Sequence, residues 1–210
     1  MCAIVGSFNI DKLKELIELN SYRGQHSHSV TYFDPKSNTA SIAEQDLGPV
    51  NVSRIHIPDG SYCIVHVQAP TTDNKTKDSI HPAIFTRSFL WHNGILKTNQ
   101  IQKLHYKHSW LKDWDTLLLL HEINSLGWEA LNNIDGTFSC LMYKQSELFL
   151  FRNEISPMFV DSELNISSTR FEGSQATEPN TVLKMRFDSK LLDPVAKFRT
   201  VENPYYFGDE

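Results

Sequence analysis

Apolar segments that favour β-strands fall into two groups along the chain, and a helical stretch lies between the groups. An amphipathic helix is expected over residues 11–20, capped by Asp11 and ended by Asn20, and a second helix over 114–127. This order predicts an α+β fold whose strands pair over long distances in the chain. The expected strands are 2–9, 30–33, 39–44, 61–69 and 83–92 in the first group, and 137–143, 147–152, 158–160, 164–169 and 181–188 in the second.

The length of 210 residues fits one large domain, or one domain with a long tail. A chain of this size can bury roughly 70% of its unfolded surface, so it needs no staple to hold it together. The final segment, FRTVENPYYFGDE, is polar, aromatic and acidic. It is expected to be either a disordered tail or a docking arm.

The charge and the cysteines limit the classes of function. A net charge of −5 gives no reason to expect binding to nucleic acid or to an anionic membrane. The three cysteines, an odd number without close pairs, argue for a reducing compartment, and Cys63 and Cys140 are expected to be buried. No signal-peptide pattern and no apolar run near the ~18 residues of a membrane helix are found, so a cytoplasmic protein is expected.

Cys2 directly follows the first methionine and directly precedes an apolar run that would anchor the terminus. Removal of Met1 would leave a thiol and a free α-amine on one residue. An α-amine has a pKa near ~7.7 to 8.0 and a thiol near ~8.5, so the amine can take the thiol proton at working pH. Cys2 is therefore a candidate N-terminal nucleophile, and the alternative is an ordinary cysteine at the second position.

His92, Asn93 and Gly94 form a second candidate element. Asn-Gly is typical of a tight turn, which is expected here at the end of strand 83–92. Acyl transfer needs hydrogen-bond donors aimed at the developing oxyanion, and the Asn93 amide with the Gly94 N–H can supply two. The alternative is an ordinary turn that closes a strand.

Five short segments occur in one order and at fitting spacings. Together they resemble the glutaminase domain of the class II glutamine amidotransferases, the N-terminal-nucleophile (Ntn) family. The resemblance covers about residues 2–190 and leaves 191–210 as a C-terminal tail or docking arm. It implies a four-layer αββα sandwich of two antiparallel sheets, the Ntn-hydrolase type. The segments are MCAIVG (1–6), YRGQHS (22–27), VHVQAPT (65–71), HNGI (92–95) and WDT (114–116).

The resemblance also implies roles for individual residues. Cys2 would be the nucleophile that forms a γ-glutamyl thioester and releases ammonia, with its own amine as the base. The oxyanion hole would be formed by Asn93 and Gly94, and Asp115 would hold the α-ammonium group of the substrate. Arg23 and Gly24 would shape the turn that supports the nucleophile. The loop after strand 61–69 would close over glutamine and exclude water. The residues implied at the substrate site are Arg23, Gln68, His92 and Asp115.

Two residues depart from the pattern of the family. Ala3 replaces the usual glycine after the cysteine, which an extended strand residue tolerates. Gln68 stands where the family usually has an arginine that grips the substrate α-carboxylate. Losing that charge-assisted pair would weaken binding by about 1.5 to 3 kcal/mol unless another cation replaces it. The candidate cations are Arg54, Lys75, Lys77 and Arg87.

The remaining histidines carry weaker signals. His105 and His108 could be imagined as metal ligands, but no third ligand is spaced to match, so neither a metal nor another cofactor is expected. His66 lies inside an expected strand and is interpreted as a buried core histidine. His81 and Pro82 are expected to end the polar loop that starts at residue 71.

Two classes of function remain. The first is a stand-alone glutaminase that hydrolyses the glutamine side-chain amide and supplies ammonia to a separate synthetase or transferase partner, which would gate its activity. Another γ-glutamyl amide as substrate stays within this class. The second is a non-catalytic scaffold or regulatory subunit with the same fold, for which Gln68 and Ala3 are the evidence.

Overall fold

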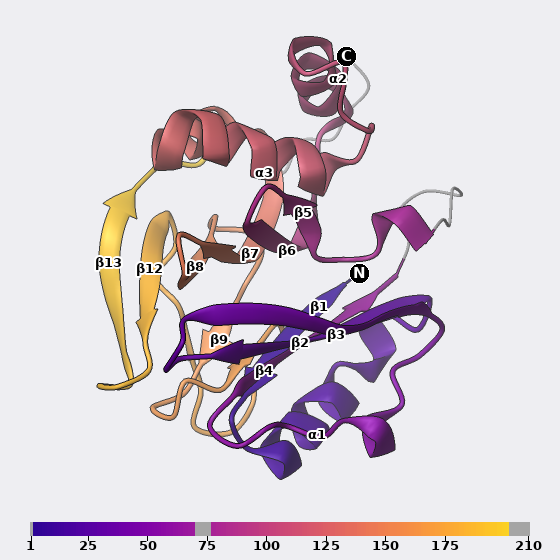
Figure 1. Ribbon diagram of the computed structural model, residues 1–210. Coiled ribbons are helices and arrows are strands. Elements are labelled where there is room, and N and C mark those ends of the chain that lie inside the picture. The colour runs from indigo at the N-terminus through magenta and orange to yellow at the C-terminus, as the bar shows by residue number, and fades with distance from the viewer. Residues whose placement is uncertain (1, 70–76, 202–210) are drawn as a thin grey trace.

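The computed structural model describes residues 2–69 and 77–201, and within them the chain forms two antiparallel sheets (Figure 1). The first sheet has seven strands in the order β11 (Gln175–Ala176), β9 (Phe159–Val160), β10 (Ile166–Ser167), β1 (Ala3–Ser7), β4 (Tyr62–Gln68), β2 (Ser27–Asp34) and β3 (Thr39–Leu47). The second has six, in the order β13 (Leu191–Lys197), β12 (Thr181–Arg186), β8 (Glu147–Arg152), β7 (Gly136–Lys144), β6 (Ser88–Leu96) and β5 (Ala83–Phe85).

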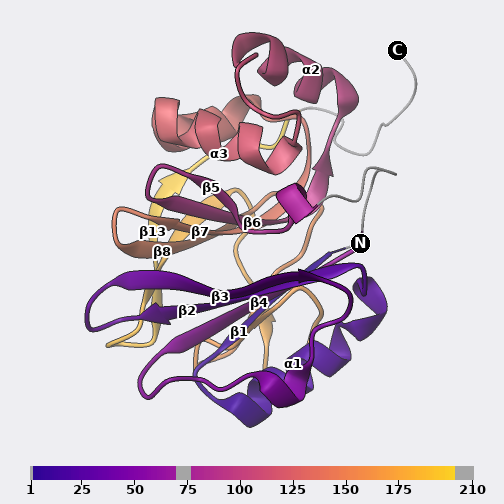
Figure 2. The same cartoon turned by 45° about the vertical axis from the view of Figure 1, so that its right-hand side comes forward.

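Three α-helices form the outer layers. Helix α1 (Ile10–Leu19) covers the free face of the first sheet, while α2 (Thr98–Lys107) and α3 (Asp115–Leu126) lie on the side of the second sheet (Figure 2). Four short 3-10 helices complete the elements of the described residues: η1 (Ser21–Arg23), η2 (Val52–Arg54), η3 (Lys77–Ser79) and η4 (Gly127–Asn133). No helix in the described part of the chain is long and apolar enough to cross a membrane.

The burial of alternate side chains explains the layers. In β1, Ile4 points between the two sheets, where it packs in one apolar cluster with Trp91 of β6, whereas Ala3 and Val5 pack toward α1. A separate cluster fills the space between the second sheet and α3. The expected four-layer αββα sandwich is therefore confirmed.

Helix α1 shows how the sequence sets one boundary. The side chain of Asn9 accepts hydrogen bonds from the backbone N–H groups of Asp11 (2.8 Å) and Lys12 (3.0 Å), so Asn9 is the cap. The expectation that Asp11 caps the helix is wrong by two positions, because Asp11 already lies in the first turn. Asn20 ends the helix as expected.

Strand β1 lies inside its sheet, between β10 and β4. Its backbone is also tied to Ser168, which donates its N–H to Ile4 O at 3.1 Å and accepts from Ile4 N through its hydroxyl at 3.0 Å. The start of the chain is thus anchored by long-range pairing, and Cys2 directly precedes a strand that is held on both sides.

Two expectations about the chain path are wrong. Asn93 and Gly94 do not form a turn; they lie within β6, opposite Ser139 and Phe138 of β7. Leu191–Lys197, which the sequence assigned to the tail, form edge strand β13 against β12. Residues 202–210 of the expected tail lie outside the described residues, as do 70–76 of the expected lid loop.

Candidate active site

The Cys2 side chain is buried, with 7% of its surface exposed. Its Sγ lies 3.5 Å from the backbone oxygen of Ala69, to which the thiol donates a hydrogen bond. Burial raises the pKa of the thiol, and the negative charge of Asp115 adds to this rise. The resting group is therefore a neutral thiol that needs a base before it can act as a nucleophile.

Arg23 lies against the backbone of Cys2, and its neighbour Gly24 lies against the end of β4. Arg23 Nε donates to Cys2 O at 3.0 Å, and Arg23 Nη1 lies 3.5 Å from Thr169 Oγ1. Gly24 packs directly on the end of β4, because a Cβ atom there would lie only 2.4 Å from the carbonyl carbon of Gln68. This is the close backbone approach for which only glycine leaves room.

Asn93 and Gly94 lie on β6, which faces β1 across the sandwich. Asn93 is two positions from Trp91, so it points into the space between the sheets, and it is 5% exposed. Among the described residues none hydrogen-bonds its side-chain amide. Gly94 has a φ of +155°, and a Cβ atom there would lie 1.9 Å from Thr137 O of the neighbouring strand. Glycine is therefore required at this position.

Asp115 is the first residue of α3 and keeps 20% of its side chain exposed. One carboxylate oxygen, Oδ1, accepts the N–H of Thr116 at 2.7 Å. The other, Oδ2, lies 3.8 Å from His92 Nδ1. The helix start fixes this carboxylate while leaving it accessible to a cationic group.

Gln68 is engaged within the chain. Its Oε1 accepts from Ser27 Oγ at 3.1 Å and lies 3.3 Å from His81 Nδ1. Its Nε2 donates to Ser79 O at 3.3 Å. Both ends of the amide thus already have partners at the position where the family has an arginine.

The candidate replacement cations are distributed over the molecule. Lys77 Nζ lies 2.9 Å from Asp46 Oδ1. Arg54 belongs to η2, and Arg87 lies in the turn between β5 and β6, at the far end of β6 from Asn93. Lys75 lies outside the described residues.

Three buried histidines, His66, His81 and His92, lie together next to Gln68 and Asp115. The sequence did not predict that they would be close to one another. The rings of His66 and His81 stack with centroids 4.0 Å apart, and both His81 Nε2 and His92 Nδ1 lie near Thr116 Oγ1, at 3.1 and 3.2 Å. Burial lowers the pKa of His66 to about 3 and that of His81 well below its usual value, so both rings are neutral. The sequence carries one signal for this group. On the face of β4 that points between the sheets, apolar Ile64 is followed by two polar side chains, His66 and Gln68.

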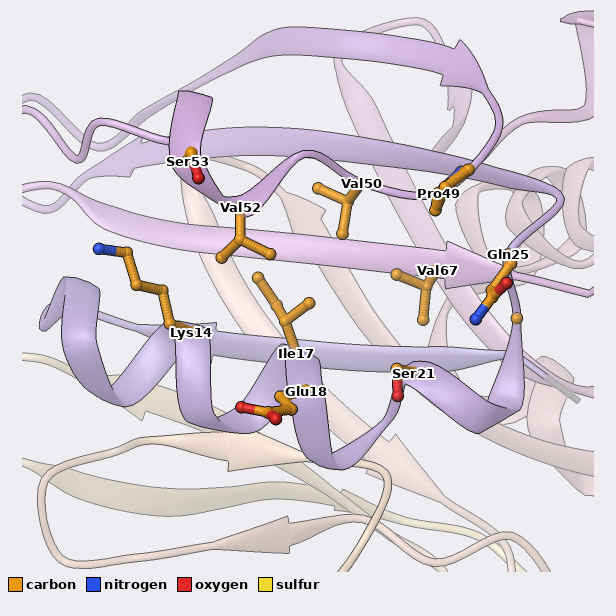
Figure 3. A pocket seen from close by; sticks show the side chains of 11 residues that line it. Lys14, Ile17, Glu18, Ser21, Gln25, Pro49, Val50, Val52, Ser53 and Val67 are labelled. Atoms are coloured by element: carbon orange, nitrogen blue, oxygen red, sulfur yellow. The ribbon is translucent and has the colours of Figure 1, made fainter.

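A separate cavity of about 460 Å³ lies on the opposite face of the first sheet, between α1 and the chain that follows β3 (Figure 3). Ile17, Val50, Val52 and Val67 form its apolar part (Figure 3). Val67 and Gln68 point to opposite faces of β4, so this strand separates the cavity from the histidines.

No family model matches the chain. A glutamine–fructose-6-phosphate aminotransferase (isomerizing) of Buchnera aphidicola subsp. Acyrthosiphon pisum (strain APS) is 26% identical over 177 residues, covering 70% of this chain and 27% of that protein. The glutamine phosphoribosylpyrophosphate amidotransferase of B. subtilis superposes with a TM-score of 0.70 at 16% identity, over 97% of this chain and 50% of that one.

A second solved structure, of the allosteric regulatory enzyme of purine biosynthesis, gives a TM-score of 0.68 at 15% identity, again over 97% of this chain and 50% of the other. The chain has the fold of a class II glutamine amidotransferase domain. The fold that the resemblance of the five sequence segments implied is thereby confirmed. The chain spans about a quarter of the length of the curated relative and half of the solved structures.

Proposed function

We propose that this domain hydrolyses the side-chain amide of glutamine through a thioester on Cys2 and supplies the ammonia to a separate synthetase or transferase. The observation that carries the proposal is the placement of Cys2: its thiol is buried and its carbonyl is held by Arg23, in front of a strand with neighbours on both sides. Such a fixed terminus is what an N-terminal nucleophile needs.

In the proposed reaction, Met1 is removed and the α-amine of Cys2 takes the thiol proton. Sγ then attacks the amide carbon, and the negative charge moves to the amide oxygen, where the Asn93 amide and the Gly94 N–H donate to it. The protonated amine returns the proton to the leaving nitrogen, and ammonia departs. Water hydrolyses the thioester to glutamate, which restores the thiol. The raised pKa of Cys2 supports the need for a base in the first step.

Asp115 is the proposed partner of the substrate α-ammonium group, because its carboxylate is fixed and partly exposed at the start of α3. The α-carboxylate lacks the arginine of the family, and the Gln68 amide is already used. Losing one charge-assisted pair costs about 1.5 to 3 kcal/mol of binding, so a KM for glutamine raised by roughly tenfold to a hundredfold is expected.

The relatives carry this domain within longer chains. For this domain we propose that the acceptor of the ammonia is a separate protein that gates hydrolysis in the cytoplasm. Residues 202–210 are proposed as its docking arm. Removal of residues 202–210 should then abolish complex formation with the partner; binding that is unchanged by the truncation would refute this role.

The experiment is an intact-mass measurement before and after treatment with a glutamine analogue that carries a diazoketone in place of the amide. Loss of Met1 and the gain of one adduct are expected in the wild type and in Cys140→Ala, a matched control for a buried cysteine away from the terminus. No adduct is expected in Cys2→Ala. A retained Met1, or a trimmed chain that gains no adduct, would overturn the proposal.

A non-catalytic scaffold with the same fold is the second candidate. The internal use of Gln68 favours it, because the described residues then lack the family's grip on the carboxylate. It predicts that Cys2→Ala and the wild type support the partner equally well. An enzyme acting on another γ-glutamyl amide is distinguished by a substrate screen with release of ammonia as the readout.

A further inference from the structure

We propose that Gln68 is a positioning residue, which acts through His81 and Thr116 to fix the ring of His92 next to the Asn93–Gly94 dipeptide. This inference rests on the proposed function in one respect, the role of Asn93 and Gly94 as donors to the oxyanion. It assigns to the glutamine a role different from that of the arginine it replaces. It follows from counting the hydrogens that these buried groups can share.

The orientation of the Gln68 amide is fixed by Ser79. The backbone oxygen of Ser79 can only accept, so the atom that faces it at 3.3 Å is Nε2. Oε1 therefore faces Ser27 Oγ and His81 Nδ1. Because Oε1 also only accepts, the hydrogen between Gln68 and His81 belongs to His81 Nδ1.

The tautomer of His81 decides the next bond. The ring is 4% exposed and neutral, so with its hydrogen on Nδ1 its Nε2 must accept. The only atom that supplies a hydrogen there among the described residues is Thr116 Oγ1, at 3.1 Å. The same hydroxyl also donates to Asp115 Oδ1 at 3.2 Å, so it joins His81 to the first turn of α3.

Thr116 Oγ1 also lies 3.2 Å from His92 Nδ1, on the next ring. The other ring nitrogen of His92, Nε2, lies 3.3 Å from the backbone oxygen of Thr137, which can only accept, so Nε2 donates to it. The His92 ring is thus held at both nitrogens, and its Nδ1 contact leads through Thr116 and His81 to Gln68.

His66 fixes the same stretch of β6 from the other side. Its Nε2 lies 3.2 Å from the backbone oxygen of His92, so it donates to the peptide group that also contains the Asn93 nitrogen. Its ring stacks on His81. The side chain and the carbonyl of His92 are thus both held, and the strand that carries Asn93 and Gly94 is held with them.

The test is the tautomer of each histidine, read by two-dimensional proton–nitrogen NMR on labelled protein, with signals assigned from single His→Gln variants. In the wild type we expect the hydrogen of His81 on Nδ1. Gln68→Met removes the acceptor at nearly constant size and should move the His81 hydrogen away from Nδ1. Gln45→Met is the matched control, since Gln45 donates to Ile80 O and His81 O but does not touch the ring.

Kinetics give the second readout. A positioning role predicts that Gln68→Met lowers kcat by roughly tenfold to a hundredfold and leaves KM within about threefold, because only the transition state needs the fixed strand. A higher KM at an unchanged kcat would identify Gln68 as a substrate ligand and overturn the proposal. A wild-type His81 with its hydrogen on Nε2, or rings unchanged by Gln68→Met, would overturn it as well. The NMR result is independent of turnover, so an inactive protein with the expected tautomers contradicts the proposed function alone.

Discussion

Mild acid is expected to destabilise the fold through His66. This ring is fully buried between the sheets, and burial lowers its pKa from 6.5 to about 3. In the unfolded chain the same ring takes up a proton near its ordinary pKa. Between these two values the unfolded state binds more protons than the folded state, so stability falls as the pH falls.

The size of the effect follows from the shift. One pKa unit corresponds to about 1.4 kcal/mol, and about one and a half pH units separate 6.5 from pH 5. His66 alone should therefore remove about 2 kcal/mol of unfolding free energy between about pH 7.5 and pH 5. His81, whose pKa burial also lowers, contributes in the same direction.

Urea unfolding at the two pH values, followed by circular dichroism, measures this loss in the wild type and in His66→Gln. The glutamine retains an amide donor but has no proton to gain. A difference in stability between this variant and the wild type at neutral pH does not affect the test, because only the change with pH is compared. The change should be smaller in the variant by about 2 kcal/mol.

His56→Gln is the matched control, because the side chain of His56 is exposed in the folded state. It should show the same loss with pH as the wild type. Equal pH dependence in the wild type and in His66→Gln would refute the reasoning, because it would mean that the folded ring takes up a proton as readily as the unfolded one.

Three further experiments test the backbone and Cys2. Gly94→Ala should lower the free energy of unfolding, measured with urea, by about 3 kcal/mol or more, because its Cβ would meet Thr137 O at a φ unfavourable for alanine; near wild-type stability would contradict this. Gly24→Ala should cost about 1 to 3 kcal/mol and slow alkylation of Cys2, because it pushes on the backbone of Gln68; an unaltered alkylation rate would argue against that contact. Alkylation of Cys2 by iodoacetamide should keep rising above the pH at which a free cysteine levels off, since burial raises the pKa of the thiol; a plateau at lower pH is the contrary result.

Local patterns predicted those elements that are rich in apolar residues. Strand β4 and helix α3, which are buried at most of their positions, were predicted on this basis, and the confirmed sandwich follows the expected strand groups. Helix α2 was missed because its sequence, TNQIQKLHYK, is mostly polar and buries few side chains. Strand β13 was missed for the same reason: it is an edge strand whose side chains are mostly exposed, and Pro194 lies in it beside a register shift.

For the candidate site too, residues in short sequence motifs could be predicted, whereas contacts between distant segments could not. Cys2, Asn93 and Asp115 belong to short motifs, and the sequence could single them out. The turn expected at Asn93–Gly94 was wrong because pairing with β7, more than forty residues away, overrides the local preference of the dipeptide. Contacts of this kind have no local signature.

The same distance limits what the sequence could say about His81 and Thr116. They are 35 residues apart, and a hydrogen bond of 3.1 Å joins their side chains. Neither residue stands out in the chain by itself. Their connection depends on how α3 packs on the second sheet, which only the fold determines.

The central position of β1 has a consequence during synthesis. Its partner β4 begins about 60 residues later in the chain, and the pairing of Val5 with Ser167 of β10 spans more than 160 residues. At roughly 5 to 20 residues per second, β4 follows β1 after about 3 to 12 seconds and β10 after about 8 to 32 seconds. An aminopeptidase would find Met1 accessible during this interval, before folding buries Cys2. Trimming would then precede assembly of the site, and a protein refolded with Met1 in place would have lost that opportunity.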